Sequence, residues 1–187
     1  MKLFLYSDLH ISRTSSILPM LKDSIYTYRQ NMIIETGKYL ANIVEQEKPD
    51  LIINLGDTFD QHTITSYDAD TAGEFFKCFK KCNIPHFVIV GNHEMINQNF
   101  NVVSMLDNVS DITIIKDPVS IQFKDTTLAF LPYCNYRDIL EYPQGDFLFS
   151  HQDIQGSKIR GNFELPDGIA QETLKQKYKL VFNRTHT

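Results

Sequence analysis

A continuous apolar run at residues 50–55 (DLIINL) constrains the fold more than any other feature of the sequence. A strand with apolar residues on both faces must be covered on both faces, which is typical of parallel sheets in α/β proteins. Similar runs occur at residues 2–7 (KLFLYS) and 85–90 (PHFVIV). Apolar residues at helical spacing occupy residues 23–46 and 69–82, between these runs. The alternation predicts an α/β fold with a mainly parallel core sheet.

The second half of the chain has a different pattern, with short apolar segments separated by turn residues. These segments occupy residues 112–115, 119–123, 127–131 and 147–150. We interpret them as short strands, and together they predict an added, more antiparallel sheet. Residues 179–183 (KLVFN) have the pattern of a last strand.

Composition limits the class of protein. With 187 residues, 42% of them apolar, the chain suits one domain with a packed core. No stretch approaches the roughly 20 apolar residues of a membrane span, so we expect no membrane association. The N-terminus lacks a signal-peptide pattern, and three cysteines without a CxxC motif indicate reduced thiols in a cytoplasm. The net charge of −5 disfavours a stand-alone nucleic-acid binder, although bound cations would neutralise some carboxylates.

Polar motifs follow the predicted strands. DLH (8–10) follows the first strand, GD (56–57) the second, GNHE (91–94) the third, and a histidine follows residues 147–150. Open α/β sheets bind ligands outside the carboxyl ends of their strands, so we expect these motifs to meet at one rim. The candidate site residues are Asp8, His10, Asp57, Asn92, His93 and His151.

These residue types favour a pair of metal ions. Carboxylate, amide and imidazole groups suit Mn, Fe or Zn better than an all-oxygen calcium site. Asp8 and His10 are two residues apart, so in an extended segment their side chains point the same way. Gly56 and Gly91 would let the backbone turn sharply at the strand ends. Each motif alone is also compatible with an ordinary turn, but their order at successive strand ends favours a metal site.

The motifs resemble those of the calcineurin-like metallophosphoesterase family, whose pattern is D-x-H, G-D, G-N-H-[DE], H and G-H-x-H. The first four are present as DLH, GD, GNHE and His151, and the resemblance covers essentially the whole chain. It implies a four-layer α/β/β/α sandwich, formed as a single domain over residues 1–187. Within the family, LGDTFD (55–60) and SHQDIQGSKIRGN (150–162) are most similar to SbcD-type DNA-repair exonuclease subunits, including those of large phages.

The resemblance also implies a role for each matched residue. Asp8 and His10 would hold the first metal ion, Asn92 and His151 the second, and Asp57 would bridge the two. The ions would be Mn²⁺, with Fe, Zn or Mg as alternatives.

Two residues of GNHE have implied roles beyond that ligand set. His93 would protonate the leaving oxygen or hold the transition-state phosphate. Glu94 would either orient a ligand or open a helix.

The last family motif differs in this chain. Where G-H-x-H is expected after KLVFN, the sequence reads Arg184-Thr185-His186-Thr187. Aligned without a gap, both family histidines are lost; with one residue deleted, His186 takes the place of the second and would be a metal ligand. We therefore expect a chain that is truncated or altered at its C-terminus and lacks the capping domain of SbcD-type subunits.

Three functions fit this sequence. The first is a two-metal DNA exo/endonuclease subunit that works with an SbcC-like ATPase, with a homodimer as a further possibility. The second is a phosphodiesterase or phosphatase acting on nucleotides or other small phosphate esters. The third is a weakly active or inactive scaffold, which the altered last motif favours.

Overall fold

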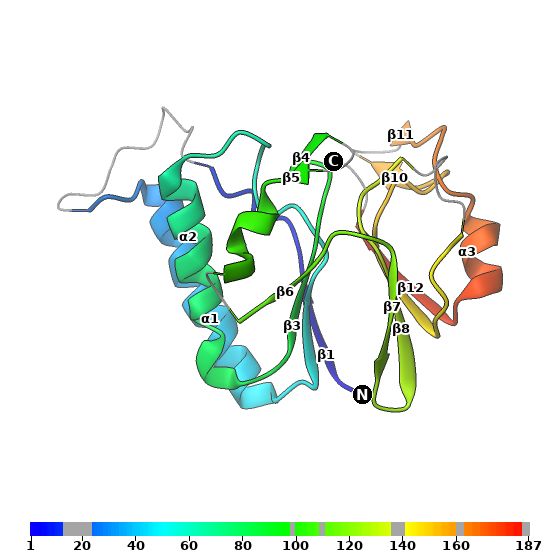
Figure 1. The fold of residues 1–187 in the computed structure, drawn as a ribbon, viewed down its shortest axis with the longest axis horizontal. Coiled ribbons are helices and arrows are strands. Elements are labelled where there is room, and N and C mark those ends of the chain that lie inside the picture. The colour runs from blue at the N-terminus through cyan, green and yellow to red at the C-terminus, as the bar shows by residue number, and fades with distance from the viewer. Residues whose placement is uncertain (13–23, 98–99, 109–110, 136–140, 160–162, 185–187) are drawn as a thin grey trace.

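The computed structural model describes residues 1–12, 24–97, 100–108, 111–135, 141–159 and 163–184. These residues form an α/β fold, as predicted, in which two four-stranded sheets face each other (Figure 1). Helices α1 and α2 lie outside the first sheet, and α3 lies outside the second (Figure 1). Within the described part of the chain, no helix is both long and apolar enough to cross a membrane.

The first sheet is wholly parallel and confirms the prediction from the first half of the sequence. Its order is β1-β2-β3-β6. These strands are β1 (Leu3–Tyr6), β2 (Leu51–Asn54), β3 (His86–Ile89) and β6 (Thr113–Ile115). Residues 112–115 were expected in the second sheet, but β6 pairs in parallel with β3.

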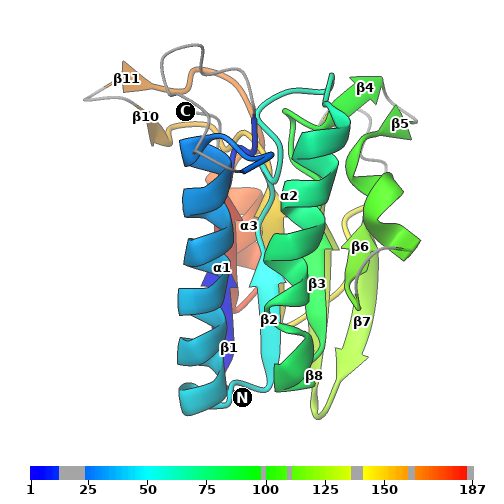
Figure 2. The same ribbon diagram turned by 90° about the vertical axis from the view of Figure 1, so that its left-hand side faces the viewer.

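Helices α1 (Tyr28–Glu47) and α2 (Ser66–Lys77) lie side by side across the first sheet (Figure 2). Both begin at a capping box, in which Thr27 or Thr65 accepts from the backbone N–H three residues later. α2 therefore starts three residues before the predicted range, and after it the chain tightens into the 3-10 helix η1 (Lys80–Cys82).

The second sheet has the order β12-β9-β8-β7. Its strands are β7 (Val119–Phe123), β8 (Thr126–Leu131), β9 (Phe147–His151) and β12 (Leu180–Arg184). The prediction of a more antiparallel sheet is confirmed only in part, since β9 pairs in parallel with both β8 and β12, and only β7 and β8 pair in antiparallel fashion. Only these two strands are joined by a tight hairpin. The chain between β9 and β12 instead includes α3 (Gln171–Lys177), and such long connections return the chain to form parallel pairs.

Three apolar layers hold the fold together. One lies between α1, α2 and the first sheet, and a second lies between the two sheets. Phe87 and Phe130 meet edge to face across this second layer, with ring centroids 5.3 Å apart. The third packs α3 against β8 and β9 through Leu174, Leu131 and Leu148. The central strand β2 is thus buried on both faces, which explains its run of three apolar residues, Leu51–Ile53.

Short elements surround the carboxyl ends of the parallel strands. They include two small hairpins and the 3-10 helix η2 (Val103–Asn108). The hairpins are formed by β4 (Met95–Asn97) with β5 (Phe100–Asn101), and by β10 (Lys158–Ile159) with β11 (Phe163–Glu164). Both hairpins lie at the same end of the molecule (Figure 1).

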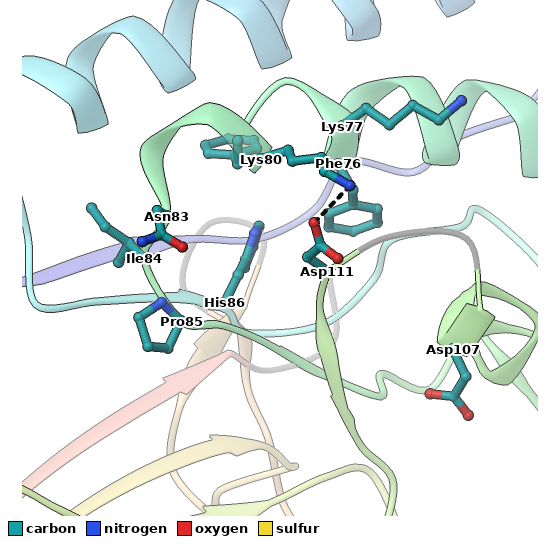
Figure 3. Close-up of a pocket in the computed structure, with 10 residues that line it drawn as sticks. Phe76, Lys77, Lys80, Asn83, Ile84, Pro85, His86, Asp107 and Asp111 are labelled. Atoms are coloured by element: carbon teal, nitrogen blue, oxygen red, sulfur yellow. Dashed lines mark ion pairs between the residues drawn. The ribbon is translucent and has the colours of Figure 1, made fainter.

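A hollow of about 720 Å³ lies at the amino end of β3, where His86 opens the strand (Figure 3). Lys80 and Asp111 form an ion pair at its edge, with 3.1 Å between Nζ and Oδ2. None of the described candidate site residues lines this hollow. The candidate site follows the other end of the strand.

Candidate metal centre

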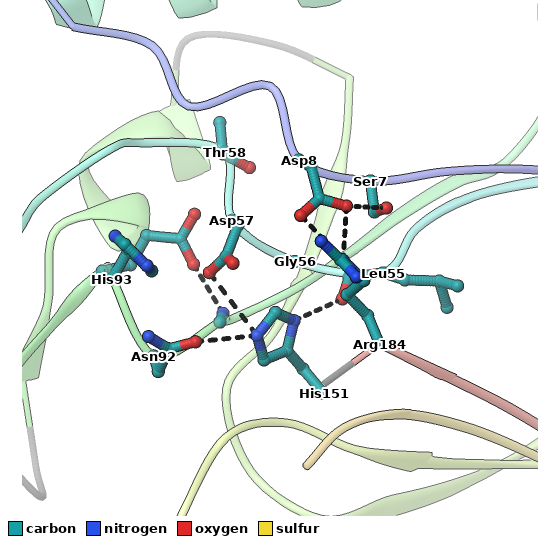
Figure 4. Close-up of polar contacts among 12 residues, drawn as sticks. Ser7, Asp8, Leu55, Gly56, Asp57, Thr58, Asn92, His93, His151 and Arg184 are labelled. Carbon is teal, nitrogen blue, oxygen red and sulfur yellow. Dashed lines mark hydrogen bonds and ion pairs between the residues drawn. The ribbon is translucent and has the colours of Figure 1, made fainter. Parts of the chain in front are cut away.

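The loops after β1 and β2 run side by side and carry the first three candidate residues. The N–H of Asp8 donates to the carbonyl of Gly56 at 3.1 Å, and the N–H of His10 donates to the carbonyl of Asp57 at 3.0 Å. The backbone pairing of the first sheet thus continues past the strand ends. It brings Asp8 and Asp57 to one rim (Figure 4). His10 lies at the same rim, within 4.0 Å of both carboxylates.

The segment from Asp8 to His10 is not extended, contrary to the expectation from its spacing. Asp8 has φ 61°, His10 has φ 43° and Asp57 has φ 56°, all in the left-handed region. Such backbone is uncommon outside glycine and is concentrated at functional sites. The side chains still converge, because His10 Nε2 lies 3.5 Å from Asp8 Oδ1 and 4.0 Å from Asp57 Oδ2.

The two motif glycines serve different purposes. Gly56 has φ 108° and makes the sharp turn that was predicted. Gly91 is not among the positive-φ glycines and is needed instead for close approach, since a Cβ there would lie 2.3 Å from Asp57 Oδ1. The absence of a side chain at Gly91 lets the loop after β3 contact the Asp57 carboxylate.

Asp57, Asn92 and His151 form one half of the site (Figure 4). His151 Nε2 lies 2.9 Å from Asn92 Oδ1 and 3.5 Å from Asp57 Oδ1. The other ring nitrogen, Nδ1, lies 2.8 Å from the carbonyl of Leu55, so the neutral imidazole carries its proton there. Nε2 then presents a lone pair toward two oxygen acceptors, an arrangement that a cation would stabilise.

Asp8 and His10 form the other half, and their charges are strongly coupled. The hydrogen bond with Asp8, more than the opposing effect of burial, raises the pKa of His10. Burial raises the pKa of Asp8, but contacts with His10, Ser7 and Arg184 outweigh it and hold this pKa well below its usual range. Arg184 Nε donates to both Asp8 oxygens at 2.7 Å. Sequence reasoning missed this contact, and the only signal was a cation directly after the predicted last strand, residues 179–183.

His93 lies beside the metal-ligand candidates. Its Nδ1 is 2.6 Å from the carbonyl of Asp60, and its ring meets the His10 ring edge to face at a centroid distance of 4.9 Å. His10, Asp57 and His93 also offer ligand atoms that all lie within 4.8 Å of one another. The geometry therefore allows His93 to contact either a metal ion or a bound phosphate.

Glu94 ties the two loops of the site together. It does not open a helix, which removes one of its two expected roles. Its fully buried carboxylate accepts from the N–H groups of Gly91 at 2.5 Å and Phe59 at 3.0 Å. Burial, together with the charge of Asp57, raises the pKa of Glu94 to about 7. The predicted ligand His186 lies outside the described residues.

A comparison with protein families connects this geometry to a known class. The family model of the calcineurin-like phosphoesterases matches residues 1–185. The chain is a member of this family. A comparison with curated proteins found no match. Members of the calcineurin-like phosphoesterase family hydrolyse phosphoesters with a dinuclear metal centre, so this chain belongs to a class of metal-dependent hydrolases.

The donor set of this calcineurin-like phosphoesterase fits a divalent cation at Asp57. Oδ1 of Asp57 is buried and has no hydrogen-bond partner. A buried, unpaired carboxylate oxygen is strongly unfavourable unless a cation neutralises it. Asn92 and His151 add an amide oxygen and an imidazole nitrogen beside it, which suits a transition-metal ion.

Proposed function

We propose that this protein is a metal-dependent DNA phosphodiesterase, an exo- or endonuclease subunit of the SbcD type that uses Mn²⁺. The observation that carries the proposal is the unpartnered Oδ1 of Asp57, with Asn92 and His151 beside it at the rim of the sheets. When bound there, divalent ions would polarise the phosphate and lower the pKa of the attacking water.

The protein groups around this site have distinct tasks. Asp57, Asn92 and His151 would hold and orient the cation, and the Leu55 carbonyl sets the tautomer of His151. Asp60 orients His93 in a similar way, because its carbonyl lies next to Nδ1. In its doubly protonated form, His93 would then deliver the proton on Nε2 to the leaving oxygen and remain a neutral imidazole with its proton on Nδ1. Asp8 and His10 are partly exposed, so both can contact a phosphate bound at this rim.

Two sequence segments support DNA as the substrate. LGDTFD (55–60) includes Asp57 and Asp60, and SHQDIQGSKIRGN (150–162) includes His151, so both are contiguous with the site. The second segment also includes Lys158 on β10, an exposed cation suited to a phosphate backbone. The proposal extends to the ATPase partner that SbcD-type subunits use.

The test compares two substrates. End-labelled linear duplex DNA and a chromogenic phosphodiester are each incubated with the protein and Mn²⁺, with a chelator as the blank. Degradation of DNA that is lost in His151→Ala supports the proposal. Hydrolysis of the chromogenic ester alone would indicate a small-molecule phosphodiesterase. No hydrolysis of either, with metal bound, would indicate a scaffold.

A further inference from the structure

Arg184 occupies the half of the site that Asp8 and His10 form. Its Nε lies 2.7 Å from both carboxylate oxygens of Asp8 (Figure 4). Arg184 is the last residue of β12 and pairs in register with His151 of β9. The pairing of β12 with β9 therefore places the Cα atom of Arg184 beside that of His151, next to the metal centre.

The hydrogen bonds from Arg184 use both carboxylate oxygens of Asp8, which are the atoms that a metal ion would bind. Asp8 also accepts from the Ser7 hydroxyl and lies 3.5 Å from His10 Nε2. A carboxylate held by a charge-assisted hydrogen bond is a strong interaction, and arginine remains charged at any working pH. A metal ion that bound Asp8 would compete with the guanidinium for these oxygens and would be repelled by its charge. At Asp57, in the opposite half, the ion-pair partners among the described residues are the imidazoles of His10 and His151, and none is an arginine or a lysine.

We propose that the Arg184 guanidinium replaces one of the two metal ions of the family. The chain then binds a single divalent ion tightly, through Asp57, Asn92 and His151. This inference rests on the proposed metal-dependent function but goes beyond it, because it concerns the number of ions and the residue that limits it. A guanidinium can offset the charge of a phosphate, but it cannot bind water as a Lewis acid.

The experiment counts bound ions. Equilibrium dialysis against Mn²⁺ gives the stoichiometry, and electron paramagnetic resonance distinguishes an isolated Mn²⁺ from a coupled pair. We expect one isolated ion in the unmodified protein and a second, coupled ion in Arg184→Gln. Arg184→Lys keeps the positive charge and is the matched control, with one ion expected. Two ions in the unmodified protein, or only one in Arg184→Gln, would overturn the inference.

A second pair of variants tests which carboxylate holds the ion. Asp8→Asn should keep the single tight ion, whereas His151→Ala should lose it. Loss of the ion in Asp8→Asn, with a normal thermal melt, would also overturn the inference. If no ion binds to the unmodified protein, the proposed metal-dependent function is wrong. The inference about the number of ions is then wrong as well. Two ions would leave the proposed function intact.

Discussion

The carboxylate of Glu94 accepts a hydrogen bond from the backbone N–H of Phe59, with 3.0 Å between the two atoms. The other carboxylate oxygen accepts from the N–H of Gly91 at 2.5 Å. One buried side chain thus joins the loop that carries Asp57 to the loop that carries Asn92. A rigid link between ligand loops maintains the distances on which metal affinity depends.

Replacing this link should weaken both stability and metal binding. In the native protein, each oxygen of Glu94 accepts from one backbone N–H. In Glu94→Gln, an amide N–H₂ group replaces one of these oxygens, so one buried backbone N–H loses its acceptor, at a cost of about 1–3 kcal/mol. For a chain of this size, that corresponds to a fall in melting temperature of roughly 2–12 °C. The measurement is a thermal melt at a pH above 7, with Mn²⁺ affinity measured in parallel. The exposed Glu164→Gln is the control and should change neither quantity.

Gly91→Ala tests the close approach of the two loops. The added methyl group would lie 2.3 Å from Asp57 Oδ1 and 2.6 Å from the Asp57 backbone nitrogen, so Asp57 must move. We expect Mn²⁺ affinity to fall roughly 10–100-fold, as when residues that orient a ligand are altered. Gly37→Ala is a matched control, because its Cβ would meet Phe75 at 2.8 Å in the helix layer. That variant should change the melting temperature but leave metal affinity intact.

The buried His86 predicts a dependence of stability on pH. Its Nε2 lies 2.8 Å from the Tyr6 hydroxyl, and burial lowers the pKa of His86 to about 3. The folded protein keeps this imidazole neutral, whereas the unfolded chain protonates it near pH 6.5. Stability is therefore lost as the pH falls below this value, at about 1.4 kcal/mol per pH unit, until the folded pKa is reached.

Urea unfolding at pH 7 and pH 5 measures this contribution. His86→Phe keeps an aromatic ring in the cluster with Phe76 and Phe79 and removes the titrating group. We expect its loss of stability between the two pH values to be smaller than that of the unmodified protein by about 2 kcal/mol. Tyr6→Phe removes the hydrogen bond but leaves His86 buried, so it should retain the original pH dependence. Equal losses in all three proteins would contradict the argument.

The first sheet could be predicted from sequence because its strands carry an unambiguous signal. β2 is buried on both faces, and its apolar run has no other common explanation at that length. The second sheet was harder, since strand direction depends on connections and not on composition. The antiparallel prediction was correct for the β7–β8 hairpin and wrong for β9 and β12.

The convergence of the motif residues could be predicted from the sequence, but their geometry could not. Strand-end placement brought Asp57, Asn92 and His151 together as expected, because parallel strands end at one rim. The left-handed backbone of Asp8 and His10 could not be inferred, since φ depends on pairing with the loop after β2. The contact between Arg184 and Asp8 could not be inferred from the sequence either, because the two residues are 176 positions apart.

The role of His93 is the sharpest chemical question at this site. In the proposed function, Nδ1 is held by the Asp60 carbonyl and Nε2 of the protonated ring would donate to the leaving oxygen. His93→Ala should then lower DNA hydrolysis about 10²–10⁴-fold and leave the metal content unchanged. The effect should be much smaller on a nitrophenyl diester, because a nitrophenolate leaves without a proton. His62→Ala removes an exposed histidine two residues after Asp60, so it is the control and should behave like the unmodified protein. Loss of metal from His93→Ala would instead assign His93 to a ligand set with His10 and Asp57, whose atoms are close enough to form one.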